Sequence, residues 1–386
     1  MPKLIRITTV PVSLLVLLKG QMKFMKQHGF DVTMISSEGK EVNDLKLQED
    51  CTHVAIKLTR KITPFTDFVS LIKLTILLRK IKPDIVHTHT PKAGLIGMWA
   101  AQLAGVKIRL HTIAGLPWVE SKGLMRRLLI IIEKITAFAA TAIFPNSFVQ
   151  RDFLLANGIA TKKMKVIGNG SSNGIDTNHF SLNDEIDKQA QVIRQQLRID
   201  ENGWAWIFVG RIVKDKGITE LIDAFLQIHA QFPEDKLLLL GIQEPDLDPL
   251  DEKYVNLLES HPAIQCCGFQ KDIRPYLAAS QVLVFPSYRE GFPNVPMQAG
   301  AMGCALILSD INGCNEIVNH EKDGWLVPVK SASALTAAML QARNNPIQTK
   351  KFAEVVKEKI KSGYAQSYLW DCLLHEYQHL LKTSKS

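Results

Sequence analysis

Short apolar runs alternate with helical patterns along most of this chain of 386 residues. The first half contains LIRITTV, FDVTMISS, CTHVAIKL, DIVHTHT, KIRLHTI and AIFPNS, and the second half contains WAWIFVG, KLLLLGI, AIQCCGF, QVLVFPS, CALILSD and GWLVPV. Strands that alternate with helices predict parallel sheets wrapped on both faces. Because the chain is too long for one typical domain, we expect an α/β protein with two doubly wound domains.

The helical segments carry a 3.6-residue period, which is clearest between residues 66 and 81. The positions expected to share one face of that helix are Phe68, Leu71, Ile72, Leu74, Thr75 and Leu78. Further helices are expected up to about residue 28 and near residues 94–104, 123–140, 218–231 and 251–260. An amphipathic tail from about residue 364 to 381 offers Tyr368, Leu369, Cys372, Leu373, Tyr377 and Leu380 for packing.

The two halves meet at a turn-rich and polar stretch. Turn residues run from Gly170 to Asp176, and the polar segment SLNDEIDKQAQ follows them. We therefore expect a first domain at 1–180, a second at 181–363, and a C-terminal helix at 364–386 that returns to the first domain. Ligands of doubly wound folds bind at the carboxyl ends of the strands, so the chemistry is expected in a cleft between the two domains.

Positive charge is concentrated in the first half. Residues 1–180 hold 25 Lys+Arg against 12 Asp+Glu, whereas the remainder holds 21 against 26. On charge alone the partner of the basic half is DNA, RNA or an anionic lipid surface. Nucleic acid is disfavoured, because the basic residues lack an aromatic-interleaved strand face or a recognition-helix pattern.

The segment SKGLMRRLLIIIEKIT at 121–136 combines a basic edge with a broad apolar face. Such a segment can lie on anionic lipid headgroups. The alternative is a buried amphipathic helix with a solvated basic edge, and the sequence favours neither. The basic residues concerned are Lys122, Arg126, Arg127 and Lys134, joined by Arg79, Lys80 and Lys82.

The spacing of the cysteines and the hydropathy of the chain indicate the cellular compartment of the protein. The six cysteines form no CxxC pair, which favours a reducing environment. No window holds the ~18 uncharged apolar residues of a spanning helix. Lys3 and Arg6 followed by VPVSLLVLL imitate a signal peptide, but Pro11 interrupts the run and a first strand fits better. We expect a cytoplasmic protein, peripheral on the inner face of the cytoplasmic membrane.

The stretch from Val282 to Ile317 reads VLVFPSYREGFPNVPMQAGAMGCALILSDINGCNEI. It predicts a strand, a turn, an acidic loop, a helix opening near Pro296 and a second strand. Glu290 in the loop and Gln298 eight residues later can both face a ligand above the strand end. Backbone N–H groups and a helix N-terminus between them suit an anion, which points to a phosphorylated or nucleotide-bearing molecule.

Two cations follow the strand WAWIFVG. Arg211 leaves the strand end and Lys216 stands at the start of the next helix, so both can converge on one diphosphate. A guanidinium offers bidentate hydrogen bonds, and an ammonium adds a point charge. The alternative is a solvated basic turn that also includes Lys214.

Several motifs in order resemble glycosyltransferase family 4, the retaining GT-B glycosyltransferases. FVGRIVKDKG, PSYREGFPNVPMQAGAMG and NGCNEIV–DGWLV are similar to the donor-binding half of that family. KPDIVHTHTPKAGLIG and GSSNGIDTNHF are similar to first-domain motifs of members that assemble bacterial surface polysaccharides. The resemblance covers nearly the whole chain and implies a GT-B fold of two Rossmann-like domains facing across a cleft.

The resemblance implies roles for the residues of the donor half. Arg211 and Lys216 match the pair that holds the donor diphosphate, and Glu290 matches the first acid of a paired-glutamate motif near the donor sugar. The second acid, expected at the ribose, is replaced here by Gln298, which implies a weakened nucleoside grip. The loop residues expected to contact the donor are Gly291, Phe292, Pro293 and Asn294.

Other candidates lie in the first domain. His87 and His111 fall near strand ends, although each is more often a structural residue, and the position of the family's donor-side histidine is Ala114 here. Asn173 resembles part of the family's interdomain turn, in which Gly174 can adopt a positive φ; a plain turn is equally compatible. The histidines have no carboxylates at ligand spacing and so predict no metal site. The resemblance implies an enzyme that needs neither a metal nor a cofactor.

The resemblance implies a retaining glycosyltransferase that uses a nucleoside-diphosphate sugar, expected to be a UDP-sugar. The expected acceptor is a polyprenyl-diphosphate-linked saccharide in capsule, O-antigen or related surface-glycan synthesis. Two alternatives remain open from the sequence. One is a GT-B sugar-nucleotide epimerase, and the other is a non-catalytic sugar-nucleotide-binding partner of a polysaccharide assembly complex.

Overall fold

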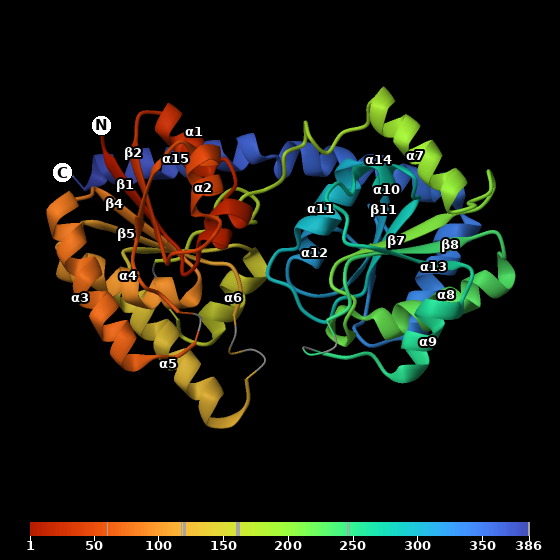
Figure 1. Ribbon diagram of the computed structural model, residues 1–386, viewed down its shortest axis with the longest axis horizontal. Helices are drawn as coiled ribbons and strands as arrows, with labels where there is room; N and C mark the ends of the chain where they lie inside the picture. Colours follow the sequence, from red (N-terminus) through yellow and green to blue (C-terminus); the bar gives the residue numbers. More distant parts are fainter. Residues whose placement is uncertain are drawn as a thin grey trace. The chain divides into compact units, whose positions relative to one another are not determined.

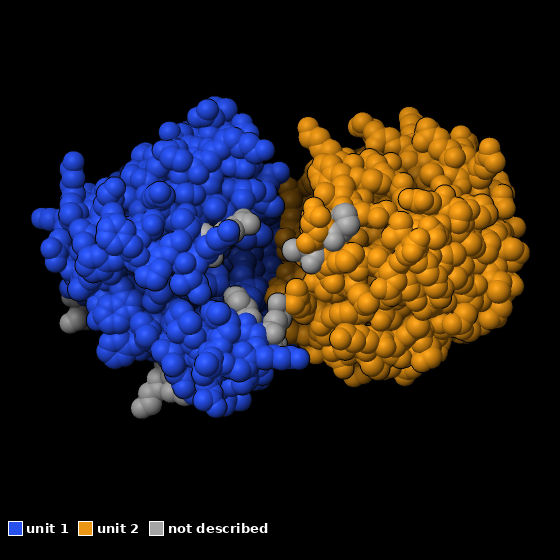
Figure 2. Space-filling view, turned by 60° about the horizontal axis from the view of Figure 1, so that its bottom comes forward, with its two compact units in different colours: residues 1–174, 366–386 blue, residues 175–365 orange. Residues whose placement is uncertain are grey.

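The chain forms two compact units, each built around one sheet. The structure is a computed structural model that describes residues 1–59, 61–116, 118, 121–159, 163–244, 246 and 248–384. Unit 1 consists of Met1–Gly174 with Gln366–Ser386, and unit 2 consists of Ile175–Ala365 (Figure 2). Each sheet has six strands, and all neighbouring strands are parallel. The expected α/β class with two doubly wound sheets is confirmed.

Unit 1 has its strands in the order β3-β2-β1-β4-β5-β6. The strands are β1 (Lys3–Ile7), β2 (Asp31–Ser36), β3 (Thr52–Ala55), β4 (Ile85–His89), β5 (Ile108–Ile113) and β6 (Ala142–Pro145). The helices are the π-helix η1 (Ser13–Leu17), α1 (Gln21–Gln27), α2 (Val42–Glu49), α3 (Pro64–Ile81), α4 (Pro91–Leu103), α5 (Gly123–Ala139), α6 (Phe148–Ala156) and α15 (Gln366–Thr383) (Figure 1).

Alternate residues of β1 belong to two separate hydrophobic cores. Ile5 and Ile7 pack with α3, α4 and α5 on one face of the sheet, whereas Leu4 packs with α1, α2 and α15 on the other. Both faces are therefore covered, as a parallel sheet requires. Arg6 lies on the same face as Leu4 and is fully buried there, which is unusual for an arginine.

The C-terminal helix α15 completes unit 1. Leu369, Leu373, Leu374 and Tyr377 are buried against that unit. Full burial of such side chains stabilises a fold by about 1.5–3 kcal/mol each, so α15 supplies a substantial part of one core. The chain passes from unit 1 to unit 2 between residues 174 and 175, and it returns to unit 1 between residues 365 and 366.

Unit 2 has its strands in the order β12-β11-β10-β7-β8-β9. They are β7 (Ala205–Val209), β8 (Lys236–Leu240), β9 (Ile264–Gly268), β10 (Val282–Phe285), β11 (Ala305–Ser309) and β12 (Trp325–Val327). The helices are α7 (Asp184–Gln196), the 3-10 turn η3 (Lys214–Lys216), α8 (Ile218–Gln231), α9 (Glu252–Ser260), α10 (Arg274–Ala278), α11 (Asn294–Ala301), α12 (Cys314–Ile317), α13 (Ala332–Asn344) and α14 (Pro346–Gly363).

Two helical segments differ from the sequence-based expectation. The polar stretch assigned to a domain boundary forms α7, because Asn183 caps its N-terminus and three apolar residues share one buried face. In α3, Leu74, Thr75 and Leu78 are buried, but Phe68 and Ile72 are exposed. Apolar residues occupy most of the circumference of α3, so the periodicity of its sequence does not show which face is buried. No helix in the described ranges is both long and apolar enough to cross a bilayer.

The strand orders define one topological switch point in each unit. In unit 1 it lies between β1 and β4, and in unit 2 between β7 and β10, because connections leave in opposite directions on either side. Ligands of doubly wound sheets bind beyond the carboxyl ends of the strands at such points. The loops after β7 and β10 contain Arg211, Lys216 and Glu290.

Three histidines lie inside unit 1. His87, His89 and His111 are at most 5% exposed. Burial, with the nearby Arg6 guanidinium as a further cause for the first two, holds the pKa of His87 and His89 well below 6.5. Burial also lowers the pKa of His111 to about 4. The unfolded chain therefore binds protons more readily than the folded unit does.

We expect acid to destabilise unit 1. Because the histidine pKa values are lowered in the folded state, stability is complete above pH 6.5 and falls as the pH decreases from 6.5 towards about 4. Urea unfolding followed by circular dichroism at pH 7.5 and 5.0 measures the change. A free energy of unfolding that stays constant or rises between these values would contradict the expectation.

Candidate active site

The loop after β10 is fixed by side chains from neighbouring segments. The Asn312 amide donates to the carbonyl oxygens of Gly291 and Glu290. The loop leads into α11, whose N-terminus has no side-chain cap. Uncapped backbone N–H groups at a helix start are available to an acceptor or an anion.

The loop after β7 is packed against the loop after β10. The backbone N–H of Tyr288 donates to the Asp215 carbonyl at 2.9 Å, and Arg289 forms an ion pair with the Asp215 carboxylate at 3.0 Å. Gly217, at φ 71°, allows this close approach, because a Cβ there would lie 2.2 Å from the Pro286 carbonyl oxygen. Glycine is therefore required at this position by both conformation and space.

Lys216 and Glu290 meet at the switch point of unit 2. The Lys216 ammonium lies 2.6 Å from Glu290 Oε1 and 3.4 Å from Ser287 Oγ. Their side chains are only 14% and 17% exposed, so both charges are largely removed from water. An ammonium has three N–H donors, which leaves capacity for a further anionic oxygen. The arrangement can hold a phosphate next to a carboxylate that accepts hydrogen bonds from hydroxyl groups.

Arg211 lies in a more open setting. Its guanidinium is 3.3 Å from Glu244 Oε2, and the two side chains are 39% and 34% exposed. An exposed ion pair of this kind contributes little to stability. Arg211 can therefore exchange Glu244 for another anion at small cost.

The other residues expected to contact the donor lie in the loop after β10 and on α11. Pro293 is buried at the start of α11, and Asn294 is the exposed first residue of that helix. Phe292 packs against Tyr364, with ring centroids 5.5 Å apart. Gln298 is half-buried on α11, and no hydrogen bond of its side chain is found within the described residues. Its place at the ribose stays a prediction.

Asn173 is fully engaged inside unit 1. Its side-chain oxygen accepts from Gln21 Nε2 at 3.1 Å and from Trp370 Nε1 at 2.7 Å, and its amide donates to the Lys19 carbonyl. Gly174 has φ 61°, as expected for this turn. The contacts of Asn173 hold the turn against α1 and α15, and they account for its presence without a ligand.

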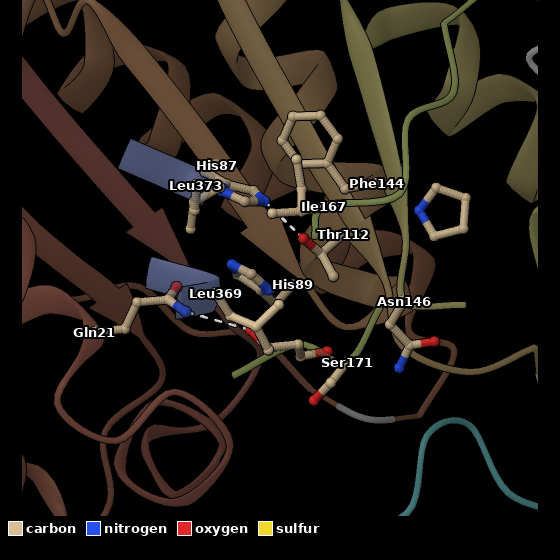
Figure 3. A pocket seen from close by; sticks show the side chains of 12 residues that line it. Gln21, His87, His89, Thr112, Phe144, Asn146, Ile167, Ser171, Leu369 and Leu373 are labelled. Atoms are coloured by element: carbon tan, nitrogen blue, oxygen red, sulfur yellow. Dashed lines mark hydrogen bonds between the residues drawn. The ribbon is translucent and has the colours of Figure 1, made fainter. Parts of the chain in front are cut away.

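His87 and His111 lie on opposite faces of the unit 1 sheet. His87 contacts Tyr377 of α15, and Figure 3 shows its hydrogen bond with Thr112 of β5. His111 contacts Thr88 at 2.8 Å, and its ring lies directly under α4, where a Cβ on Gly94 would be 2.3 Å from it. These contacts account for both as structural residues, and their role in substrate binding stays a prediction.

The structure draws attention to two residues that the sequence did not single out. Asn312 supports the Glu290 loop, although its motif NGCNEIV was noticed as a whole. Thr90 follows β4 at the switch point of unit 1, with φ 73° and ψ 143°, and its hydroxyl lies 2.8 Å from that of Thr9. A β-branched residue with positive φ is a conformational outlier of the kind that clusters at functional sites. Nothing in the local sequence predicts this backbone conformation of Thr90.

Histidine, cysteine and acidic side chains do not gather into a metal site in the part of the chain that the structure describes: no group of three or more that could hold an ion is present there.

Comparison with known proteins identifies the family. Residues 189–359 match the family model described as glycosyl transferases group 1, and residues 10–147 match the model glycosyl transferase 4-like. The capsular polysaccharide biosynthesis glycosyltransferase CapM of Staphylococcus aureus is 31% identical over 385 residues, which covers 99% of this chain and 98% of that protein.

A second relative and a solved structure are also similar to this chain. An Escherichia coli protein named UDP-Gal:alpha-D-GlcNAc-diphosphoundecaprenol alpha-1,3-galactosyltransferase is 26% identical over 372 residues, 93% of each chain. The crystal structure of Anabaena Alr3699/HepE in complex with UDP superimposes with a TM-score of 0.81 at 17% identity, covering 98% of this chain and all of that one.

The two Rossmann-like units and their structural neighbours define a GT-B protein. The chain belongs to glycosyltransferase family 4, and it is a glycosyltransferase enzyme.

Replacing Gly217 with alanine is expected to destabilise unit 2. The new Cβ meets the Pro286 carbonyl, and the residue must also adopt a positive φ, so the cost is at least ~2 kcal/mol. Gly268→Ala is the matched control, because Gly268 also has a positive φ but a Cβ added there would meet nothing within 4 Å. Urea unfolding of both variants tests this. Equal losses would show that contact with Pro286 is unimportant.

Proposed function

We propose that this enzyme transfers a sugar from a UDP-sugar to a polyprenyl-diphosphate-linked saccharide, with retention at the anomeric carbon. The meeting of Lys216 and Glu290 at the switch point of unit 2 carries the proposal, because it combines a phosphate-binding cation with an acceptor for sugar hydroxyls. The names of relatives support the substrate classes: the Escherichia coli relative is named for UDP-Gal and a diphosphoundecaprenol acceptor. A neighbouring structure contains UDP-glucose.

In the proposed mechanism, Arg211 and Lys216 stabilise the departing nucleoside diphosphate. The acceptor hydroxyl oxygen forms a bond to the anomeric carbon on the face from which the diphosphate leaves, while the bond from that carbon to the diphosphate oxygen breaks. The departing oxygen takes the proton of the acceptor hydroxyl, so charge and atoms balance. Glu290 orients the donor sugar through its hydroxyl groups. Stabilisation of developing negative charge by fixed cations is usually the largest catalytic term.

A donor and acceptor assay tests the reaction class. The protein is incubated with labelled UDP-sugars, with and without a polyprenyl-diphosphate-linked saccharide, and we expect labelled lipid-linked product only when both are present. Epimerised sugar nucleotide without acceptor would instead identify an epimerase. Binding of donor without turnover would identify a non-catalytic partner of an assembly complex.

The same assay tests the role of Arg211. Arg211→Ala is expected to lower turnover by about 10²–10³-fold, because one charge-stabilising group is lost from the transition state. The fold should remain intact, since Arg211 is 39% exposed and its ion pair with Glu244 is exposed. Lys253→Ala is a matched control, because Lys253 also forms an exposed pair in unit 2 but lies outside the site. Near-normal turnover of Arg211→Ala would refute the assigned role.

We further propose that unit 1 binds an anionic membrane surface through an apolar patch on α3 and α5. These helices flank α4 on one face of the sheet (Figure 1). The exposed apolar side chains of this patch are Phe65, Phe68, Ile72 and Ile76 on α3, and Leu124, Met125, Leu128, Ile131, Ile135 and Phe138 on α5. Ten exposed apolar side chains on two helices that cover one face of a sheet favour an interaction site.

The charge around the apolar patch selects the partner. Lys122, Arg126, Arg127 and Lys134 on or next to α5 are all exposed. Apolar side chains bordered by cations match a surface of anionic headgroups over acyl chains, where each cation adds ~1 kcal/mol. The exposure of α5 also disfavours the alternative of a buried amphipathic helix. A membrane position would place the enzyme beside a lipid-linked acceptor.

Vesicle sedimentation tests this docking. Phe65→Ser combined with Leu124→Ser is expected to weaken binding to phosphatidylglycerol-containing vesicles at least tenfold, because two side chains that are 83% and 82% exposed no longer enter the bilayer. Ile347→Ser is the matched control, since Ile347 is 87% exposed on α14 in unit 2. Unchanged binding of the double variant, or equal binding of wild type to phosphatidylcholine alone, would refute the proposal.

A further inference from the structure

A small cavity in unit 1 lies between the sheet and α15, on the face that holds Arg6. Its volume is about 20 Å³, which is room for roughly one water-sized species. Figure 3 shows Thr112 and His89 next to each other, with Gln21 on one side and Asn146 on the other. None of the lining residues is acidic; they are Gln21, His87, His89, Thr112, Phe144, Pro145, Asn146, Ile167, Ser171, Ser172, Leu369 and Leu373.

Arg6 lies behind the wall of this cavity without a carboxylate partner. Its side chain is 0% exposed, and its guanidinium donates to Tyr377, Gln21 and His89. No acidic residue within the described ranges forms an ion pair with it. The acid that acts on it most, Glu49, accepts hydrogen bonds from backbone N–H groups instead. A buried cation with only neutral partners is unfavourable unless an anion lies nearby.

The first chain of hydrogen bonds from Arg6 ends at Thr112. A guanidinium can only donate, so the Tyr377 oxygen accepts from Arg6 at 2.8 Å. The Tyr377 hydroxyl proton then has one acceptor among the described residues, His87 Nδ1 at 2.5 Å, which assigns the direction of this hydrogen bond. His87 is neutral and therefore carries its proton on Nε2, which donates to Thr112 Oγ1 at 2.7 Å. The Thr112 hydroxyl proton is left over, and no described residue accepts it.

The second chain is shorter and ends at His89. Arg6 donates to His89 Nε2 at 2.8 Å, so the neutral ring carries its proton on Nδ1. No described residue accepts from His89 Nδ1, and the ring lines the cavity. Each chain thus ends in a donor at the same cavity. Hydrogen bonds in a chain polarise one another, so the Arg6 charge strengthens both terminal donors.

From this convergence we propose that the cavity binds a small inorganic anion of halide size. The His89 Nδ1–H and the Thr112 hydroxyl donate to it, and Arg6 supplies the balancing charge. The site lies on the opposite face of the sheet from α4. Because Tyr377, Leu369 and Leu373 belong to α15, occupancy is coupled to the docking of that helix on unit 1.

A water molecule is the competing occupant. The Asn146 Oδ1 atom is buried without a hydrogen-bond partner and requires a donor, which water supplies and an anion does not. Bromide is the informative probe, since it is a monatomic halide with a measurable anomalous signal. Gluconate, which is too large for this cavity, can keep the ionic strength constant.

Two measurements on the full chain test the site. In crystals grown with bromide, an anomalous peak is expected within hydrogen-bond distance of His89 Nδ1 and Thr112 Oγ1. In solution, replacing gluconate with bromide at constant ionic strength should raise the melting temperature, and the rise should follow the logarithm of bromide concentration above the dissociation constant. Water alone in the cavity, with superimposable melting curves, would overturn the proposal.

Paired variants connect the two measurements to Thr112. Thr112→Val removes the donor with little change of shape and is expected to abolish the bromide-dependent rise in melting temperature. Thr112→Ser retains the hydroxyl and should preserve most of that rise. If Thr112→Val responds to bromide as the wild type does, the anion binds elsewhere. If Thr112→Val does not fold, the bromide peak and the Thr112→Ser melting curve still decide the question.

Discussion

The contact between Arg6 and Tyr377 holds the two ends of unit 1 together. Arg6 lies on the central strand β1, and Tyr377 lies on the last helix, 371 residues later in the sequence. Around this hydrogen bond, α15 buries apolar side chains against the sheet and His87 is fixed between Tyr377 and Thr112. A charged side chain at the centre of a core requires defined partners, so it specifies one position of α15. The neutral histidines, the cavity and the turn at Asn173 all depend on that position.

Unit 2 uses a different device to create its site. Parallel strand order brings the loops after β7 and β10 to the same edge, and Gly217 permits them to touch. Lys216 and Glu290 then share a partly dehydrated site in which each lowers the cost of burying the other. An anion that replaces Glu290 as the partner of Lys216 leaves the Glu290 carboxylate able to accept hydrogen bonds from hydroxyl groups. The same close packing therefore holds a cation and a carboxylate side by side at the strand ends.

Much of this architecture was predictable from the sequence, because strand and helix periods and the ordered motifs are local signals. The helix at 218–231 was placed at its observed bounds, and GT-B topology followed from the resemblance. What was not predictable depends on tertiary contacts. The apolar circumference of α3 hides which face is buried, and the polar composition of α7 resembles a linker. The backbone conformation of Thr90 and the support that Asn312 gives to Gly291 appear only when distant segments meet.

The discontinuous construction of unit 1 has a consequence for the order of folding during synthesis. Residues 1–174 leave the ribosome first, yet their sheet lacks the cover of α15 until the last part of the chain has been made. At about 5–20 residues per second, unit 2 is synthesised over roughly ten seconds or more while Leu4 and its neighbours remain partly uncovered. The second unit can thus reach its native fold before the first one, and chaperones have a defined interval in which to bind the open face.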